Sequence, residues 1–232
     1  MTLALDTDDF VPALHQSIRL MRDVLSGAGC GVPAATLRDR SLAAWVREHG
    51  VTVTARGDEE LDLVQYNGVR PTQVVFRCGA QTDSIRRAVN LGVFRFIVST
   101  ERHIGRLSEC AQRTKYVYLD DDTPLVLGNR RLKVIGLHGD VDDSGGPVEW
   151  ATEAERLLCR SALLKTCGSP IHRIMLSGGS SDIWVRGGGT QLSSIVSAVD
   201  EALTEGCARW QLARPAVTLT PAASAASRTI AD

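Results

Sequence analysis

The residues with the clearest chemical potential in this sequence follow an apolar run near its middle. In the segment LKVIGLHGDVDD (132–143), His138 and Asp140 end the run and two more aspartates follow. An imidazole within hydrogen-bond reach of a carboxylate serves general acid–base catalysis, and carboxylates around a histidine also bind divalent cations. A third interpretation is that these aspartates only solvate a glycine-rich turn. We predict an acid–base pair of His138 and Asp140, with Asp39 as a further catalytic candidate and without a metal.

Residues at the ends of other apolar runs could bind an anionic substrate. Alternation along VVFRC (74–78) points either Arg77 or Cys78 toward one face of a strand, and an arginine there can hold a carboxylate. A nucleophilic cysteine at this place would lack a dedicated base. The full set of predicted substrate-binding residues is Arg38, Arg77, Gly178, Gly179, Ser180 and Arg214.

The three small residues of this set belong to a turn, LSGGSSD (176–182). Backbone N–H groups in such a turn can cradle a phosphate or a carboxylate. The alternative is an inert connection between a strand and the next helix.

Apolar runs and helical patterns alternate along the chain. The runs that we predict to be strands are 31–36, 51–55, 73–78, 94–99, 115–120, 132–138, 172–177 and 210–214. Helices are predicted at 10–27, 42–49, 58–67, 82–91, 101–112, 149–165 and 191–205. Eight strands alternating with helices predict a single (β/α)8 barrel of the α/β class, whose ligand sites lie at the carboxyl ends of the strands. The alternative is an open, doubly wound sheet.

The barrel is expected to occupy residues 1–214 as one domain. For 215–232 we expect a weak final helix or an Ala/Ser-rich tail. The connection at 121–131 contains proline and glycine and is too short for a good helix, so we predict an irregular link between the fifth and sixth strands.

Composition excludes several classes of protein. The chain has 232 residues, 44% of them hydrophobic, and a formal net charge of -1, so no basic surface for nucleic acid is indicated. No window reaches the roughly 20 apolar residues of a membrane-spanning helix, and we expect a soluble, cytoplasmic protein without a membrane partner. The six cysteines form no CxxC pair, which favours reduced thiols.

Four segments together resemble a known family. They are GVTVTARGDEELDLVQYNGVRPTQVVFRCGAQTDSIRRAVNLGV, LKVIGLHGDVDD, HRIMLSGGSSD and WQLARPAV. In order and spacing they resemble the barrel domain of the pyridoxal-phosphate decarboxylases that act on diaminopimelate or ornithine and share the alanine racemase fold. The resemblance covers about residues 8 to 230 and implies a barrel of that type.

The position of the Schiff-base lysine departs from the family pattern. Registering 35–39 on the family's Ala-Val-Lys-Ala-Asn strand places Leu37 at the lysine. The only lysines are Lys115 and Lys133, at the starts of predicted strands, and Lys165, in a predicted helix, so none substitutes easily. A Schiff base requires an amine, which leucine does not offer.

Other residues of the family's motifs are also replaced in this sequence. In the Gly-Leu-His-x-His-x-Gly-Ser motif the first histidine is kept, Asp140 replaces the histidine that stacks on the cofactor ring, and Asp143 replaces the serine. Ser180 stands at the third glycine of the phosphate turn, and Glu-Pro-Gly-Arg becomes Arg-Pro-Ala-Val at 214–217. We also expect no counterpart of the family's C-terminal β-domain, which completes the substrate site across a dimer interface.

Two functional classes remain open. One is a cofactor-independent enzyme, of the cyclase, isomerase or lyase type, that acts on a small amino-acid-derived metabolite. The other is a non-catalytic relative that binds a metabolite or regulates a true decarboxylase, as a homodimer or paired with that enzyme. The charged residues at the replaced positions favour the enzyme, and no cofactor is expected in either case.

Overall fold

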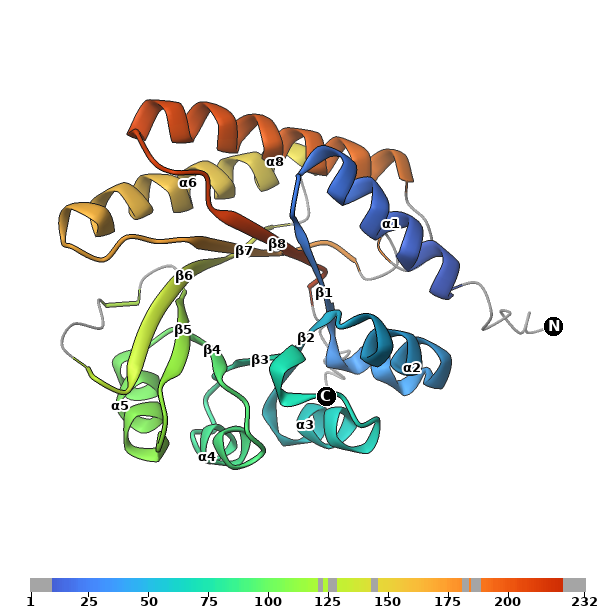
Figure 1. The fold of residues 1–232 in the computed structure, drawn as a ribbon, viewed down its shortest axis with the longest axis vertical. Helices are drawn as coiled ribbons and strands as arrows, with labels where there is room; N and C mark the ends of the chain where they lie inside the picture. Colours follow the sequence, from blue (N-terminus) through green and yellow to red (C-terminus); the bar gives the residue numbers. More distant parts are fainter. Residues whose placement is uncertain are drawn as a thin grey trace, which may run out of the picture.

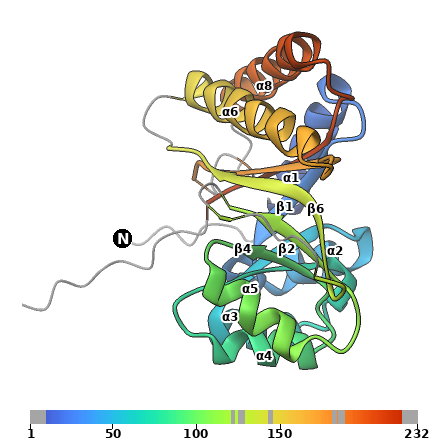
Figure 2. The same ribbon diagram turned by 90° about the vertical axis from the view of Figure 1, so that its left-hand side faces the viewer.

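The computed structural model describes residues 10–120, 123–124, 129–142, 146–180, 184 and 189–222. Its strands lie at the centre of the molecule and its helices surround them (Figure 1). Helices α1, α6 and α8 pack on one side of the strands, and α2 to α5 lie on the other (Figure 2).

The elements follow one another as strand and helix. The strands are β1 (Gly29–Pro33), β2 (Thr52–Arg56), β3 (Val74–Arg77), β4 (Arg95–Val98), β5 (Lys115–Leu119), β6 (Leu132–Asp140), β7 (Arg173–Ser177) and β8 (Ala216–Thr220). The helices are α1 (Phe10–Val24), α2 (Arg40–His49), α3 (Gly57–Tyr66), α4 (Asp83–Asn90), α5 (Glu101–Cys110), α6 (Pro147–Thr166) and α8 (Gly189–Trp210), with short 3-10 turns η2 (Ala34–Arg38) and η3 (Pro71–Gln73).

Each strand pairs in parallel with the next, and β1 pairs with β8. The sheet is therefore closed, which confirms the predicted (β/α)8 barrel and excludes the open doubly wound sheet. Parallel strands place all their carboxyl ends at one mouth of the barrel. Residues at these ends are brought together even when they are far apart in the sequence.

Alternation along the strands separates two apolar clusters. One face contributes to a large core between strands and helices, in which Phe76, Leu119 and Leu176 are fully buried. The other face points into the barrel, where Val75, Ile97, Tyr118 and Met175 form a small internal cluster. Because side chains alternate with a period of two, the residues two positions further along these strands line the mouth of the barrel.

Local sequence explains how α2 follows β1. The side chain of Asp39 caps the helix by accepting hydrogen bonds from the backbone N–H of Ser41 (2.9 Å) and Leu42 (3.0 Å). The helix ends at Gly50, which has the positive φ of 67° that glycine adopts without strain.

The last strand lies further along the chain than predicted. Helix α8 continues to Trp210, and Leu212 N–H still bonds to Cys207 O at its end (3.0 Å), so 210–214 is not a strand. The strand is formed by 216–220, AVTLT, in which Val217 and Leu219 enter the outer core. The barrel therefore extends to Thr220, beyond the predicted boundary at 214.

The first strand also ends earlier than predicted. Strand β1 stops at Pro33, and Leu37 lies on η2, 1% exposed within the outer core. Cys30 and Val32 face that core, so the last inward-facing residue of β1 is Pro33. Leu37, which the motif alignment placed at the lysine, therefore lies four residues beyond the last residue of β1.

Two other expectations fall partly or wholly outside the described residues. In the connection at 121–131, the described parts, 123–124 and 129–131, contain no helix. The final helix or tail was expected over 215–232; of these residues 216–220 form β8, and 223–232 are not described. All six cysteines are free thiols.

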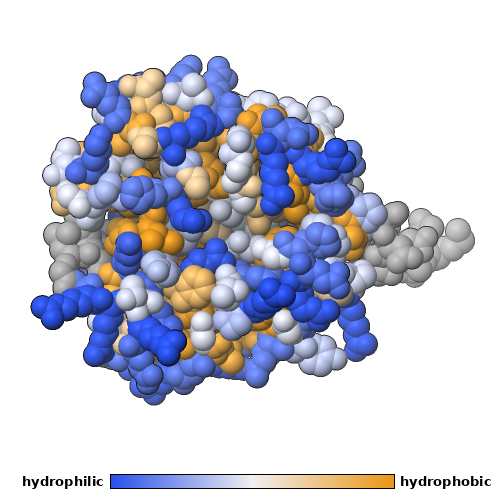
Figure 3. Space-filling view, viewed as in Figure 1, coloured by the Kyte–Doolittle hydropathy of each residue, from blue (hydrophilic) through white to orange (hydrophobic). Residues whose placement is uncertain are grey.

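Hydrophilic and hydrophobic side chains are mixed on the face of the molecule in Figure 3. The most exposed large hydrophobic residues are Tyr66, on α3, and Val148 and Leu163, which stand 15 positions apart on α6. Among the described residues, no helix is both long enough and apolar enough to cross a bilayer.

Candidate active site

Polar side chains surround the mouth of the barrel. Every strand end contributes one or two inward-facing residues: Pro33, Arg56, Arg77, Ser99, Asp120, His138, Asp140, Ser177 and Thr220. Ser99 and Asp120 each stand one residue beyond their strands, and the others are within theirs. This ring is the part of the barrel where (β/α)8 proteins build their active sites.

His138 is the centre of the ring. It is fully buried, and both ring nitrogens have partners: Nδ1 lies 2.9 Å from Oδ1 of Asp120, and Nε2 lies 2.9 Å from Oγ of Ser177. A carboxylate only accepts hydrogen bonds, so in the neutral imidazole Nδ1 carries the proton. Nε2 is then the acceptor for the Ser177 hydroxyl and is available to take a proton.

Asp120 is held by three side chains. Oδ1 accepts from His138, whereas Oδ2 accepts from Ser99 Oγ (2.7 Å) and Arg77 Nη2 (3.1 Å). Burial alone would raise the pKa of Asp120, but the hydrogen bonds from His138 and Ser99 and the charges of His138 and Arg77 lower it well below its usual range. Asp120 therefore remains a carboxylate that fixes the orientation of the imidazole.

Asp140 is held mainly by Arg77. The two Nη atoms of Arg77 donate to both oxygens of Asp140, the Nη1–Oδ1 distance being 2.6 Å. Asp140 Oδ1 is 3.9 Å from His138 Nε2, too far for a hydrogen bond. The predicted pair of His138 and Asp140 is thus close in space, but Asp120 is the carboxylate bonded to the histidine.

Arg77 is the member of VVFRC that points inward. Its guanidinium bridges Asp120 and Asp140, while Cys78 packs into the outer core and burial raises the pKa of its thiol to about 12. A thiol with so high a pKa is a poor nucleophile at neutral pH, which removes Cys78 as a candidate.

Helix α6 supports the ring from outside. Arg160 donates to the backbone oxygens of Asp120 (2.7 Å) and Thr123 (2.6 Å) and so fixes the end of β5. Glu153 packs behind Gly139. Burial and the charges of Asp140 and Asp120 raise the pKa of Glu153 to about 7. Two hydrogen bonds from Arg156 act in the opposite direction and favour the charged carboxylate. Glu153 therefore lies outside the lumen.

Three predicted residues have roles other than those expected. Asp39 caps α2. Burial alone would raise the pKa of Asp39, but the hydrogen bonds that it accepts from Ser41 and Leu42 outweigh burial and lower the pKa. Arg38 is exposed on η2. Arg214 precedes β8, at the opposite end of the barrel from the site, and bonds to Asp200 and Thr204 of α8. The structure thus gives Asp39 a capping role and places Arg214 away from the barrel mouth, and substrate binding by Arg38 stays a prediction.

The glycine turn after β7 is only partly available to an anion. Gly178 N–H donates to Thr220 O (3.0 Å), and a Cβ at Gly178 would meet Val141 at 2.7 Å. Gly179 has φ of 73°, and Ser180 is exposed. An anion could therefore not use the Gly178 amide, and binding by Gly179 and Ser180 stays a prediction.

The site also contains four residues that we did not predict from the sequence: Ser177, Ser99, Arg56 and Thr220. Within the described part of the chain, the Arg56 side chain has no hydrogen-bond or ion-pair partner, and its pKa is lowered by burial and by the charge of Arg77. The buried hydroxyl of Thr220 likewise has no partner there. The signal that could have found these residues is inward alternation at each strand end.

Asp120, His138 and Asp140 place ligand atoms within 4.8 Å of one another, as a metal site requires. Arg77 already bonds to both carboxylates, and Ser177 is bonded to the histidine. A cation would have to displace a guanidinium, so this arrangement is better suited to an ion-pair network than to a metal.

The fold of the chain is similar to that of a known class of barrel. The chain is a (β/α)8 barrel of the kind that forms the barrel domain of pyridoxal-phosphate decarboxylases. No protein-family model and no curated protein sequence matches it.

Several solved decarboxylases share this fold. Diaminopimelate decarboxylase from M. jannaschii superposes with a TM-score of 0.74 at 13% identity, over 91% of this chain and 59% of that one. Lysine decarboxylase from Selenomonas ruminantium gives 0.71 at 12% identity, over 91% and 60%. The arginine decarboxylase of Paramecium bursaria Chlorella virus, bound to agmatine, gives 0.71 at 14% identity, over 91% and 62%. The chain spans about three-fifths of these proteins, and at such identities the likeness concerns the fold.

The residues at the barrel mouth do not fit the Schiff-base role of the family's cofactor. Lys115 and Lys133 begin β5 and β6 at the far end of the barrel, Lys115 Nζ donates to Val93 O (2.7 Å), and Lys165 bonds to Gln211 O near the end of α6. Pro33 occupies the inward position at the end of β1. None of the three lysine amines therefore reaches the site.

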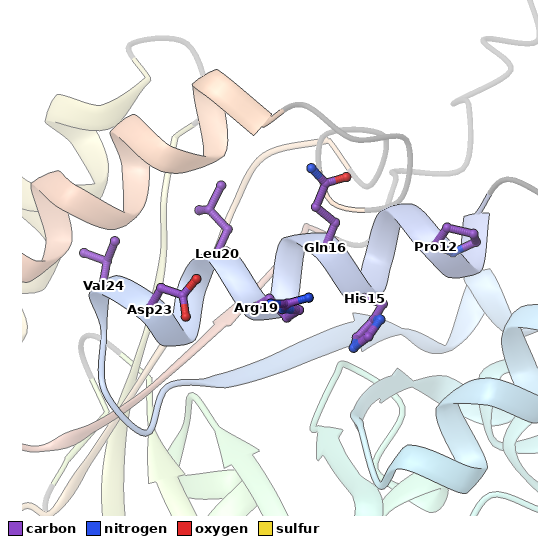
Figure 4. A pocket seen from close by; sticks show the side chains of 7 residues that line it. All are labelled: Pro12, His15, Gln16, Arg19, Leu20, Asp23 and Val24. Atoms are coloured by element: carbon purple, nitrogen blue, oxygen red, sulfur yellow. The ribbon is translucent and has the colours of Figure 1, made fainter.

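A groove on α1 is unrelated to this site. Figure 4 shows its lining side chains, among them His15, Gln16 and Arg19, all of which come from the one helix. A shallow surface lined by a single helix lacks the converging polar groups of a ligand pocket.

Proposed function

We propose that this barrel is an enzyme that uses acid–base chemistry at His138, without pyridoxal phosphate, on a small amino-acid-derived carboxylate. The observation that carries the proposal is the chain of two 2.9 Å contacts from Asp120 to His138 and from His138 to Ser177. Asp120 orients the ring and stabilises its charged form, and Nε2 takes and returns the proton.

Arginines would anchor the substrate. Arg56 has a guanidinium without a hydrogen-bond or ion-pair partner among the described residues, at the mouth of the barrel beside Arg77. An exposed arginine without a partner at the mouth of the barrel can bind a carboxylate through two hydrogen bonds. Arg77 is already paired with two aspartates, so we assign it the role of holding Asp120 and Asp140 in place.

The test begins with small carboxylates that purify with the protein, identified by mass spectrometry after denaturation. Turnover of each is then followed by NMR for the wild type, His138→Gln and His172→Gln. His172 is an exposed histidine before β7, at the other end of the barrel, and serves as the matched control. We expect His138→Gln to lower turnover by about 10²–10⁴ and His172→Gln to leave it unchanged. Turnover within threefold of wild type in His138→Gln would overturn the proposal.

One observation favours a second candidate. His138 is fully buried, and protein atoms occupy both of its nitrogens, as in a structural network. In this alternative the barrel binds a metabolite, or regulates a decarboxylase as a homodimer or as its partner, without catalysis. Ligand binding that persists in His138→Gln, with no turnover in the wild type, would support it.

A further inference from the structure

Four consecutive strands present four polar side chains in chain order at the mouth of the barrel. Strands β5, β6, β7 and β8 place Asp120, His138, Ser177 and Thr220 there. The first three are linked by hydrogen bonds of 2.9 Å each. A carboxylate, an imidazole and a hydroxyl linked in this way have the geometry of an activated nucleophile.

We propose that Ser177 is a covalent nucleophile and that the site transfers or hydrolyses an acyl group. This inference rests on the proposed role of His138 as a base. The substrate class is an ester, thioester or activated amide that carries an anionic group for Arg56.

The hydroxyl of Thr220 is placed to stabilise the developing charge. Thr220 is the register partner of Ser177 on the neighbouring strand, and both side chains face the lumen. It is 1% exposed, and its Oγ1 has no hydrogen-bond partner among the described residues. A Cβ on Gly31 would lie 2.4 Å from this oxygen, so the glycine leaves the hydroxyl its space. A buried hydroxyl without a partner beside a nucleophile is suited to donate to an oxyanion.

The reaction proceeds in two balanced halves. Ser177 Oγ bonds to the acyl carbon while its proton passes to His138 Nε2; the bond from that carbon to the leaving group breaks, and the leaving group takes the proton. Water then attacks the acyl carbon and gives a proton to Nε2. The bond to Oγ breaks, Oγ recovers the proton from Nε2, and the carboxylic acid leaves.

The probe for this chemistry is a fluorophosphonate. Ser177 Oγ would bond to phosphorus, fluoride would leave, and the hydroxyl proton would pass to His138. We expect one label per folded chain, located at Ser177 by peptide mass spectrometry. Ser177→Ala should give no label, and Thr220→Val, which removes only the hydroxyl, should slow labelling at least about tenfold.

Ser84 offers the matched control. It is a buried serine on α4, 2% exposed, and its Oγ has no partner in the described part of the chain, so Ser84→Ala should fold and label like the wild type. Circular dichroism on each variant separates lost labelling from lost folding.

Each outcome decides between the two proposals. A folded wild type that is not labelled at Ser177 overturns the nucleophile, and an unchanged labelling rate in Thr220→Val overturns the role of Thr220. If Ser177 is not labelled but His138→Gln still abolishes turnover, only the covalent step fails and the acid–base function stands. If neither effect is seen, both fail.

Discussion

Nδ1 of His138 lies 2.9 Å from Oδ1 of Asp120, and this contact joins β6 to β5 at the mouth of the barrel. The two residues are 18 positions apart in the sequence and meet because their parallel strands are neighbours. The contact gives the ring one orientation, and its other nitrogen faces Ser177.

Asp120→Asn should destabilise the protein. The Asp120 side chain is 14% exposed and accepts hydrogen bonds from His138, Arg77 and Ser99, so its replacement leaves Arg77 with less charge compensation. Breaking a buried ion pair costs about 3–5 kcal/mol, and we expect the lower end because Asp140 still pairs with Arg77. Denaturant unfolding measures the loss.

The matched control is Asp62→Asn. Asp62 pairs with Arg87 on the surface, where its side chain is 65% exposed, and such pairs contribute about 0–1 kcal/mol. Equal losses in the two variants would mean that the network at the barrel mouth adds no stability.

Stability should fall as the pH is lowered from about 5 to about 2. The pKa of Asp120 is lower in the folded protein than the value of about 3.9 in unfolded chains, so the unfolded state binds more protons in this range. The stabilisation is therefore present above the unfolded pKa and is lost as the pH falls toward the folded one. Urea unfolding at several pH values measures the slope.

The variant Asp120→Asn measures how much Asp120 contributes to the dependence of stability on pH. Asp39 and Asp140 also have lowered pKa values, so some acid sensitivity should remain in the variant. A slope in Asp120→Asn equal to that of the wild type would contradict the assignment to Asp120.

Pyridoxal phosphate should form no internal aldimine with this chain. None of the three lysines lies at the carboxyl end of a strand, and Pro33 faces the lumen where an amine would be needed. Titration with pyridoxal phosphate, borohydride reduction and peptide mapping test this. A stoichiometric reduced adduct at one lysine would contradict the prediction.

Pro33→Lys is the informative comparison for that titration. It places an amine at the inward position of β1, so we expect it to gain a borohydride-reducible adduct at residue 33. Adduct formation by the wild type to the same extent would show that the position of Pro33 is not decisive.

The alternation of apolar runs was sufficient to predict the closed barrel and seven of its strands. The eighth was misplaced because WQLAR contains apolar residues, whereas Trp210 ends a long amphipathic helix. The β-branched run AVTLT, with its period of two, was the better signal for a strand. Placing this strand too early also put Arg214 at the wrong end of the barrel.

The structure brings Arg77, His138 and Asp140 close together because each stands at a strand end, but Asp140 bonds to Arg77 and not to His138. His138 bonds to Asp120 because the pairing register of β5 and β6 brings these two side chains together. A bulge shifts that register, so the sequence alone does not predict the pair. Ser177 looked like the first residue of a glycine turn, and only its inward position reveals the contact with the histidine.

The tautomer of His138 decides whether its Nε2 can act as a base toward Ser177. We would record the ring nitrogens and their couplings to the ring protons by NMR at a pH of about 8, with exposed His172 as the internal comparison. We expect a proton on Nδ1, directed at Asp120, and an unprotonated Nε2 that accepts from Ser177. A proton on Nε2 instead would contradict it, because His138 could then not act as the base toward Ser177.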